Sequence, residues 1–177
     1  MKEYNCIIGI DFGVNGGIAI NADGRTVVSK MPKDISAIGE FLQFYKETYN
    51  PICFVEKLSI RTDDLTGGKV FRIRKMIANQ EGIKAIISLA GVDFCEVHPL
   101  TWQSRLGLRI VGEEKPVRKR RYKEVAQNLY PQCDVTMANC DALLIMRFGI
   151  DILQSEKKKD KKWLSDNIAI SKRNVIF

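Results

Sequence analysis

Histidine is almost absent from this sequence, and its cysteines are scattered. His98 is the single histidine, and one histidine cannot build a zinc site by itself. No two cysteines form a Cys-x-x-Cys pair, and three of them lie in apolar, strand-like runs. We therefore predict free, buried thiols rather than metal ligands or disulfides. The five cysteines are Cys6, Cys53, Cys95, Cys133 and Cys140.

Long apolar runs are missing as well. No segment reaches the roughly 20 apolar residues that are needed to cross a bilayer. The first apolar run, residues 4–12, contains Asp11 and is not followed by the small-residue cleavage site of a signal peptide. Internal repeats and an interdomain linker are also lacking. We therefore expect a soluble, intracellular protein with one domain and no membrane partner.

Positive charge, in contrast, is present in excess. The sequence has 28 Lys and Arg against 21 Asp and Glu, which gives a formal net charge of +7. A basic domain of this size is biased toward polyanions such as nucleic acid. Simple solubility is the alternative explanation, and charge alone does not decide between the two.

Strand-like and helical patterns follow one another in a regular order. Strands are predicted at residues 4–12, 52–56 and 92–97, and a hairpin with its turn at Asp23-Gly24 is predicted over residues 17–30. Helices are predicted at residues 34–49, 69–90, 117–130 and 138–153. Three antiparallel strands followed by βαβ units predict an α/β domain, with helices on the faces of a mixed five-stranded sheet. We expect this domain over residues 1–154, followed by a basic C-terminal tail, residues 155–177.

Three acids lie at the ends of predicted core elements. Asp11 ends the first strand, Glu56 ends the strand 52–56, and Asp141 lies near the start of an apolar helix. A buried carboxylate is costly unless it is paired or binds a metal. Each acid alone has a structural alternative as a helix cap or an ion-pair partner. Together they can converge at one sheet edge, where Mg²⁺ would offset their repulsion.

Five segments in this order resemble the RuvC-like Holliday-junction resolvases, in particular the phage, bacterial and poxviral branch. They span about residues 7–149 and read IIGIDFGVNGGIAI (7–20), FVEKLSI (54–60), EVHPLTWQSRLGL (96–108), EKPVRKRRYKEVAQNLYP (114–131) and CDALLIMRFG (140–149). The resemblance implies an RNase H-like fold and a metal-dependent endodeoxyribonuclease that cuts four-way DNA junctions. It also implies a homodimer, and a bacterial or virus-infected cell as the setting.

The resemblance assigns roles to individual residues. Asp11, Glu56 and Asp141 correspond to metal ligands, with Glu56 between two Mg²⁺ ions that Mn²⁺ can replace. Lys115 resembles a family lysine that contacts the scissile phosphate. These four residues are the predicted catalytic set.

The sequence departs from the family at one expected ligand. The family usually has an Asp or His about one helical turn before its last acid, whereas this chain has Ala138 there. The neighbouring Asn139 is predicted to supply a weaker oxygen ligand, and Asp134 is the alternative.

Two basic segments are predicted to contact DNA. One is the helix 117–130 with the lysine before it, and the other is the start of the helix 69–90. A solvated helix face is the alternative for both. In the resemblance, the loop 59–68 enters the junction, and Phe71 or Ile60 inserts between bases, although a core or interface role is favoured for both. The predicted DNA-binding residues are Arg72, Arg74, Lys75, Lys115, Arg118, Lys119, Arg120, Arg121 and Lys123.

Two other functions stay open from the sequence alone. The missing ligand near Asp141 favours a junction-binding protein of the same fold with weak or no catalysis. The segment IDFGVNGGIAI also resembles the phosphate loop of actin-like and sugar-kinase-type nucleotide binders. That group usually has two lobes, for which this chain is short.

Overall fold

The structure is a computed structural model that describes residues 3–13, 15–60 and 69–169. Its strands are β1 (Cys6–Asp11), β2 (Gly17–Ala22), β3 (Arg25–Lys30), β4 (Pro51–Glu56), β5 (Asp93–Val97) and β6 (Ile168–Ala169). Its helices are α1 (Ser36–Thr48), α2 (Lys69–Leu89), α3 (Pro99–Arg105), α4 (Lys115–Leu129), α5 (Cys140–Leu153) and α6 (Lys158–Asn167).

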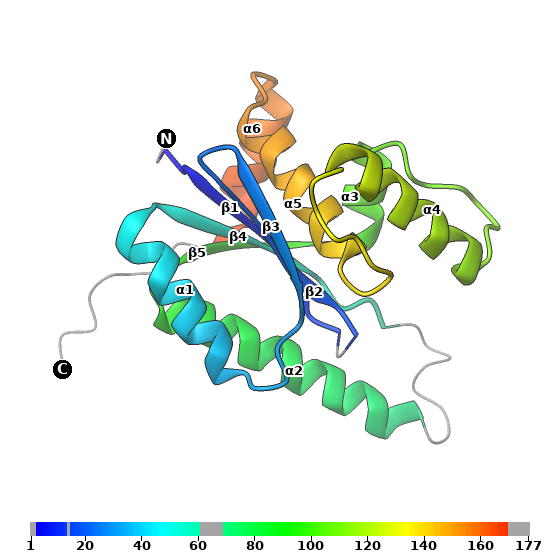
Figure 1. The fold of residues 1–177 in the computed structure, drawn as a ribbon, viewed down its shortest axis with the longest axis horizontal. Coiled ribbons are helices and arrows are strands. Elements are labelled where there is room, and N and C mark those ends of the chain that lie inside the picture. Colours follow the sequence, from blue (N-terminus) through cyan, green and yellow to red (C-terminus); the bar gives the residue numbers. More distant parts are fainter. Residues whose placement is uncertain (1–2, 14, 61–68, 170–177) are drawn as a thin grey trace.

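One mixed sheet organises the chain (Figure 1), with strand order β3-β2-β1-β4-β5-β6. The first three strands pair antiparallel, β4 and β5 continue parallel to β1, and β6 is antiparallel to β5. The predicted α/β class and mixed sheet are confirmed. The sheet has the five expected strands and a short sixth, β6, in the segment predicted as a tail.

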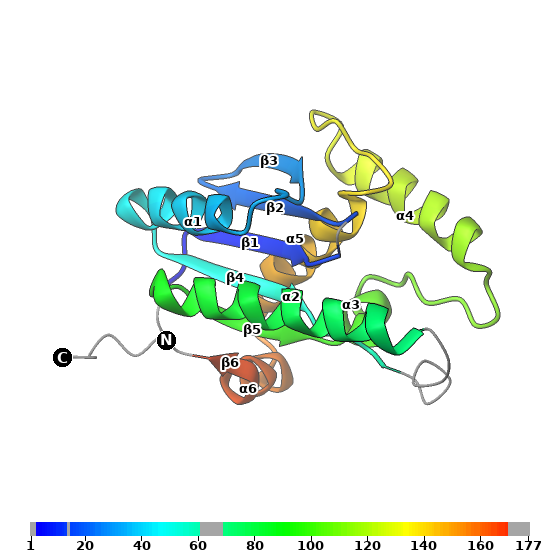
Figure 2. The same cartoon turned by 90° about the horizontal axis from the view of Figure 1, so that it is seen from below.

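Helices cover both faces of the sheet (Figure 2). α1 and α2 pack on one face over Ile8, Ile10 and Val55. α3, α4, α5 and α6 cover the other face, where the core includes Phe54 and Trp102. Because β1 and β4 are covered on both sides, they read as nearly continuous apolar runs.

The most apolar helix, α5, lies directly on β1. A Cβ atom added at Gly9 would lie 2.3 Å from the carbonyl oxygen of Ala142 and 2.4 Å from the backbone nitrogen of Met146. No side chain fits between the two backbones, so β1 must carry glycine at this position. The close contact fixes the first half of α5 against β1.

The charged segment after α5 is folded within the part that the structure describes. Residues 158–167 form α6, whose Leu164 is buried and whose Trp163 ring lies 5.4 Å from that of Phe148. The carboxylate of Asp160 accepts a hydrogen bond from Ser155 at 2.5 Å and pairs with Arg105 at 3.0 Å. The segment 155–169 therefore packs on the predicted domain instead of extending from it as a tail.

The five cysteines are free thiols, as predicted, and four of them are buried, while Cys133 is half-buried. None of the described helices combines the length and the apolar character that crossing a bilayer requires.

Candidate active site

The sheet brings the ends of β1 and β4 side by side. The two strands pair in parallel, so Asp11 and Glu56, their last residues, lie at the same edge of the sheet. Side chains alternate between the faces of a strand. Ile10 and Val55 belong to the core under α1 and α2, so Asp11 and Glu56 point to the opposite face, where α3, α4 and α5 lie.

A tight glycine turn holds Asp11. The backbone N–H of Gly13 donates to Asp11 Oδ1 at 3.1 Å, and the N–H of Gly16 donates to the Gly13 carbonyl at 2.7 Å. A Cβ atom at Gly16 would lie 2.1 Å from the backbone oxygen of Asp11. The glycines of this turn thus allow the chain to fold back over the carboxylate.

Trp102 holds Glu56. The indole Nε1–H of Trp102 donates to Glu56 Oε1 at 3.0 Å, and the tryptophan itself is 1% exposed. Its ring packs edge-on against Tyr122 of α4, with 5.4 Å between the ring centroids. Trp102 was predicted as a core residue, and the structure confirms this. Its hydrogen bond to the acid could not be read from the sequence.

The beginning of α5 brings Asp141 to the same place. Gly17 pairs with Asp11 in the sheet, and a Cβ atom at Gly17 would lie 2.9 Å from the Cα atom of Asn139. The residue before α5 thus packs on the strand partner of Asp11. Asp141 lies in the first turn of α5, where the helix dipole stabilises negative charge.

The three carboxylates interact electrostatically. Burial raises the pKa of Asp11, and the charge of Asp141 raises it further, against the hydrogen bond from Gly13. Burial also raises the pKa of Glu56, to about 8, with contributions from the charges of Asp11 and Asp141. Like charges that are close together and poorly hydrated favour a shared proton or a cation between them.

Lys119 supplies a cation at this site. Its Nζ donates to Asp141 Oδ2 at 2.5 Å. Burial lowers the pKa of Lys119, but the charge and hydrogen bond of Asp141 raise it more, so the net shift is upward. The positive charge of Lys119 in turn lowers the pKa of both Asp11 and Glu56. Lys119 therefore faces the acids, whereas we predicted it as a DNA contact.

The donor set suits a hard divalent ion, because Mg²⁺ and Mn²⁺ prefer carboxylate oxygens. Within residues 3–13, 15–60 and 69–169, however, no group of three or more His, Cys, Asp or Glu side chains is arranged to hold a metal ion as it stands. Both oxygens of Asp141 accept from the protein, Oδ2 from Lys119 and Oδ1 from the Cys140 thiol at 3.4 Å. The chemistry of the three acids fits a metal, but Asp141 would have to exchange these partners first.

Asn139 is committed to the loop that precedes α5. Its Oδ1 accepts from the N–H of Thr136 at 2.7 Å, and its Nδ2 donates to the carbonyl of Asp134 at 3.0 Å. The residue is 3% exposed. These contacts give its amide a structural role and do not favour the predicted role as a metal ligand. The side chain of Asp134 is exposed.

The other cations of helix α4 differ in their surroundings. Lys115, its exposed first residue, is near enough for its charge to lower the pKa of Asp11. Arg121 donates to both carboxylate oxygens of Glu113, at 2.9 and 2.6 Å, and to the Leu108 carbonyl at 2.8 Å. This fixes the loop 108–113, so the prediction of Arg121 as a DNA contact is not supported. Arg120 and Lys123 are exposed further along the helix, and Arg118 is half-buried.

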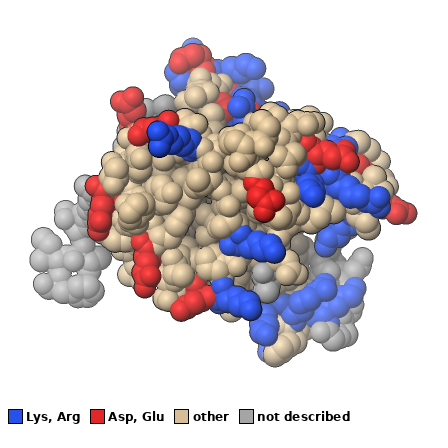
Figure 3. All heavy atoms as spheres, viewed as in Figure 1, with Lys and Arg blue, Asp and Glu red and all other residues tan. Residues whose placement is uncertain are grey.

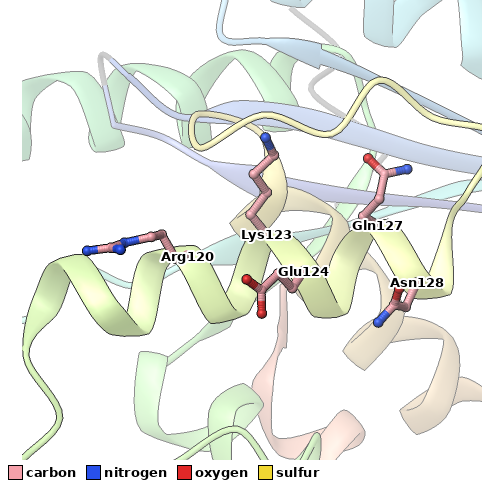
Figure 4. A pocket seen from close by; sticks show the side chains of 5 residues that line it. All are labelled: Arg120, Lys123, Glu124, Gln127 and Asn128. Atoms are coloured by element: carbon pink, nitrogen blue, oxygen red, sulfur yellow. The ribbon is translucent and has the colours of Figure 1, made fainter.

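The outer side of α4 forms a shallow pocket. Figure 4 shows Lys123 and Gln127 on one side of the helix axis and Glu124 and Asn128 on the other, with Arg120 extended along the helix. Two cations, two amides and one acid line this pocket. The cations and the amides can donate hydrogen bonds to phosphate oxygens, whereas Glu124 cannot.

A second group of cations lies at the beginning of α2. Arg72, Arg74 and Lys75 are exposed, and Lys75 Nζ lies 6.0 Å from the ring centroid of Phe71, which is itself 72% exposed. Figure 3 shows Lys and Arg gathered over α4 and over the start of α2, on the same face of the molecule. Phe71 is therefore not a core residue of the described chain. Ile60 is also exposed, and most of the predicted loop 59–68 lies outside the described residues.

Two amides of α2 bind the backbone behind the acids, a feature that the sequence did not predict. Asn79 Nδ2 donates to the carbonyl of Phe12 at 2.6 Å. Gln80 Nε2, on a side chain that is 5% exposed, donates to the carbonyl of Glu56 at 3.3 Å and to Glu96 Oε1 at 3.0 Å. These contacts tie α2 to the strand ends that carry Asp11 and Glu56.

The comparisons with known proteins concern the fold. No protein-family model matches the sequence, and no curated protein gives a significant match. Among solved structures, Thermus thermophilus RuvC in complex with a Holliday junction substrate is similar, with a TM-score of 0.50 and 12% identity over 81% of this chain and 90% of that chain. A second Thermus thermophilus RuvC structure has a TM-score of 0.49 and 14% identity, over 81% and 92% of the two chains. The chain therefore shares the RNase H-like fold of RuvC.

Proposed function

We propose that this protein is a structure-selective DNA endonuclease that resolves four-way junctions by metal-dependent hydrolysis of phosphodiester bonds. One observation carries the proposal: Asp11, Glu56 and Asp141, far apart in the sequence, come together at one sheet edge and act on one another electrostatically. The similar RuvC structure with a Holliday junction supports branched DNA as the substrate.

In this proposal, the three acids hold Mg²⁺, or Mn²⁺ in its place. Two bound ions would supply an activated water and stabilise the leaving oxygen. Lys115 is exposed at the start of α4 and close enough to act on Asp11, which supports a contact between Lys115 and the phosphate at the cut. Asn139 is left out of the ligand set because its amide serves the loop.

The substrate would lie across the two basic groups. Arg120 and Lys123 on α4, and Arg72, Arg74 and Lys75 on α2, would contact phosphates. We further propose a homodimer, because two-fold symmetry would present two active sites to two opposed strands of a junction. Such an enzyme would serve DNA recombination or repair.

A cleavage assay tests this function. A labelled four-way junction is incubated with the protein and Mg²⁺ or Mn²⁺, beside a linear duplex of the same sequence. We expect paired nicks in the junction only. Asp11→Asn should abolish cutting and keep binding, because it removes a ligand charge but no DNA contact.

Asp23→Asn is the matched control. It makes the same change at an exposed acid in the turn between β2 and β3, so cutting should continue at the wild-type rate. The proposal is wrong if the wild-type protein cuts nothing with either metal across a pH series, or if Asp11→Asn cuts as the wild type does.

A junction-binding protein with weak or no catalysis is the second candidate. It is favoured because Lys119 and Cys140 occupy both oxygens of Asp141, and because the amide of Asn139 is committed elsewhere. Tight binding to the junction, measured by gel shift, with no metal-dependent cutting in the same assay would select this candidate.

A further inference from the structure

The ammonium group of Lys119 lies among acids that are proposed to bind metal. It is 2.5 Å from Asp141 Oδ2, and its side chain is 27% exposed against 16% for that of Asp141. An ion pair this short and this shielded from water is not a solvated surface contact. It provides the positive charge that three converging carboxylates require.

The position of Lys119 on α4 explains why it points inward. Lys119, Tyr122 and Ala126 are spaced by three and four residues, so they share one side of the helix. Tyr122 and Ala126 are buried against the core. Lys119 continues this buried stripe toward the beginning of α5, where its side chain meets Asp141.

We propose that Lys119 is a built-in counter-cation, which occupies Asp141 in the metal-free protein and must release it before a divalent ion can bind. The inference rests on the proposed metal site and adds a competing residue to it. A lysine amine and a metal ion cannot share the same carboxylate lone pairs at full strength. Metal binding therefore has to break one ion pair, which lowers the apparent affinity for the metal.

Metal affinity without DNA tests the competition. Mn²⁺ is titrated calorimetrically into the wild type and into Lys119→Met, which keeps the length of the side chain but removes its charge. We expect Lys119→Met to bind Mn²⁺ roughly tenfold more tightly, which is the effect of removing a competing pair of modest strength. In EDTA, the same variant should unfold at a lower temperature than the wild type, because its acids have lost their cation.

Lys123→Met is the matched control. It removes the same charge from the same helix one turn further on, at an exposed position. Exposed charges are screened by salt. The effect of Lys123→Met on Mn²⁺ affinity should therefore be small, and it should vanish in about 0.5 M KCl, where the screening length is about 4 Å. The effect of Lys119→Met should persist there. Equal shifts in the two variants, or no shift in Lys119→Met, would overturn the inference.

A labelling experiment on the wild type covers the case in which Lys119→Met does not fold. Acetylation of each lysine is followed by mass spectrometry with and without Mn²⁺. Lys119 should react faster once Mn²⁺ has displaced it from Asp141, while Lys123 should not change. Unchanged acetylation of Lys119 under saturating Mn²⁺ contradicts the inference.

The failures of the two proposals are distinguishable. Suppose that Mn²⁺ binds the wild type, that Asp11→Asn abolishes this binding, and that Lys119→Met does not change the affinity. The proposal of a counter-cation is then wrong, and the proposal of a metal site is supported. If neither the wild type nor Lys119→Met binds Mn²⁺, both the counter-cation and the metal-dependent nuclease are wrong.

Discussion

At the scale of single residues, the main feature of the site is that carboxylates are buried near the core, where ionisation is unfavourable. Asp11 and Glu56 end strands whose other residues are almost all apolar. Within the described part of the chain, each accepts one hydrogen bond, from Gly13 and Trp102 respectively. One hydrogen bond does not replace the hydration that a carboxylate loses on burial, which is why the pKa of both acids is raised.

The raised pKa of Glu56, about 8, predicts how stability depends on pH. An acid whose pKa is higher in the folded state favours folding while it is protonated. That contribution is complete below the pKa of the unfolded chain and is lost as the pH rises through about 8. We expect the melting temperature in EDTA to fall between about pH 5 and pH 9.

Glu56→Gln isolates this contribution. The amide has nearly the same shape and does not ionise, so the melting temperature of the variant should fall less over the same pH range. Thermal unfolding by circular dichroism at a series of pH values makes the comparison. Parallel curves for the wild type and the variant would show that Glu56 does not titrate as described.

Some residues of the site could be predicted from the sequence, and others could not. Asp11 and Glu56 were placed correctly at strand ends, because an acid that ends an apolar run is visible in the sequence. The metal-binding roles of these residues stay predictions. The contact of Lys119 with Asp141 was missed because a run of cations suggests an exposed helix face, although the spacing of Lys119 to Tyr122 and Ala126 indicated the buried side. The partner of Arg121, Glu113, lies outside the helix and gave no comparable signal.

At the scale of elements, α4 divides its cations between buried and exposed positions. Its inner side carries Lys119 toward the acids and Tyr122 into the core. Its exposed residues Arg120 and Lys123 line the pocket. Arg121 belongs to neither, because its guanidinium fixes the loop before the helix.

This division predicts different outcomes for substitutions in one helix. The double variant Arg120→Ala/Lys123→Ala should weaken junction binding and reduce the slope of log Kd against log salt by about two, one for each lost phosphate contact. Folding should be unaffected, since both side chains are exposed. Fluorescence anisotropy over a salt series measures the slope.

Arg121→Ala serves as the comparison. It should lower the free energy of unfolding, because it removes the hydrogen bonds that join Arg121 to Glu113 and to the Leu108 carbonyl. The salt slope of DNA binding should stay at the wild-type value. The division of α4 is contradicted if Arg121→Ala reduces the slope as much as the double variant does.

At the scale of the whole molecule, regular structure continues past residue 154, into the segment predicted as a tail. The segment KKKDKKWLSD was interpreted as a tail because charge dominates its composition. Two apolar residues, Trp163 and Leu164, are nevertheless enough to dock α6 beside Phe148, and β6 then pairs with β5. A short amphipathic helix is hard to recognise when lysines fill most of its positions.

Trp163→Ala tests the docking of α6. The ring is half-buried, so its loss should cost about 2 kcal/mol of unfolding free energy, which is less than for a fully buried tryptophan. Lys161→Ala is the control, since Lys161 pairs with Glu156 on the surface and should change stability by less than about 0.5 kcal/mol. Urea unfolding measures both. Equal unfolding free energies of the two variants would show that Trp163 does not dock α6 on the domain.

Two amides connect α2, which carries part of the proposed DNA surface, to the strand ends that carry the acids. Asn79 and Gln80 grip the peptide carbonyls of Phe12 and Glu56, while the exposed cations Arg72 to Lys75 lie nearer the start of the same helix. From Arg72 to Asn79 an α-helix rises about 10 Å. A regular helix is stiff over this distance. The helix therefore fixes the distance between its exposed cations and the strand ends that carry Asp11 and Glu56. A displacement of the basic end of α2 would be transmitted to the backbone of those two acids.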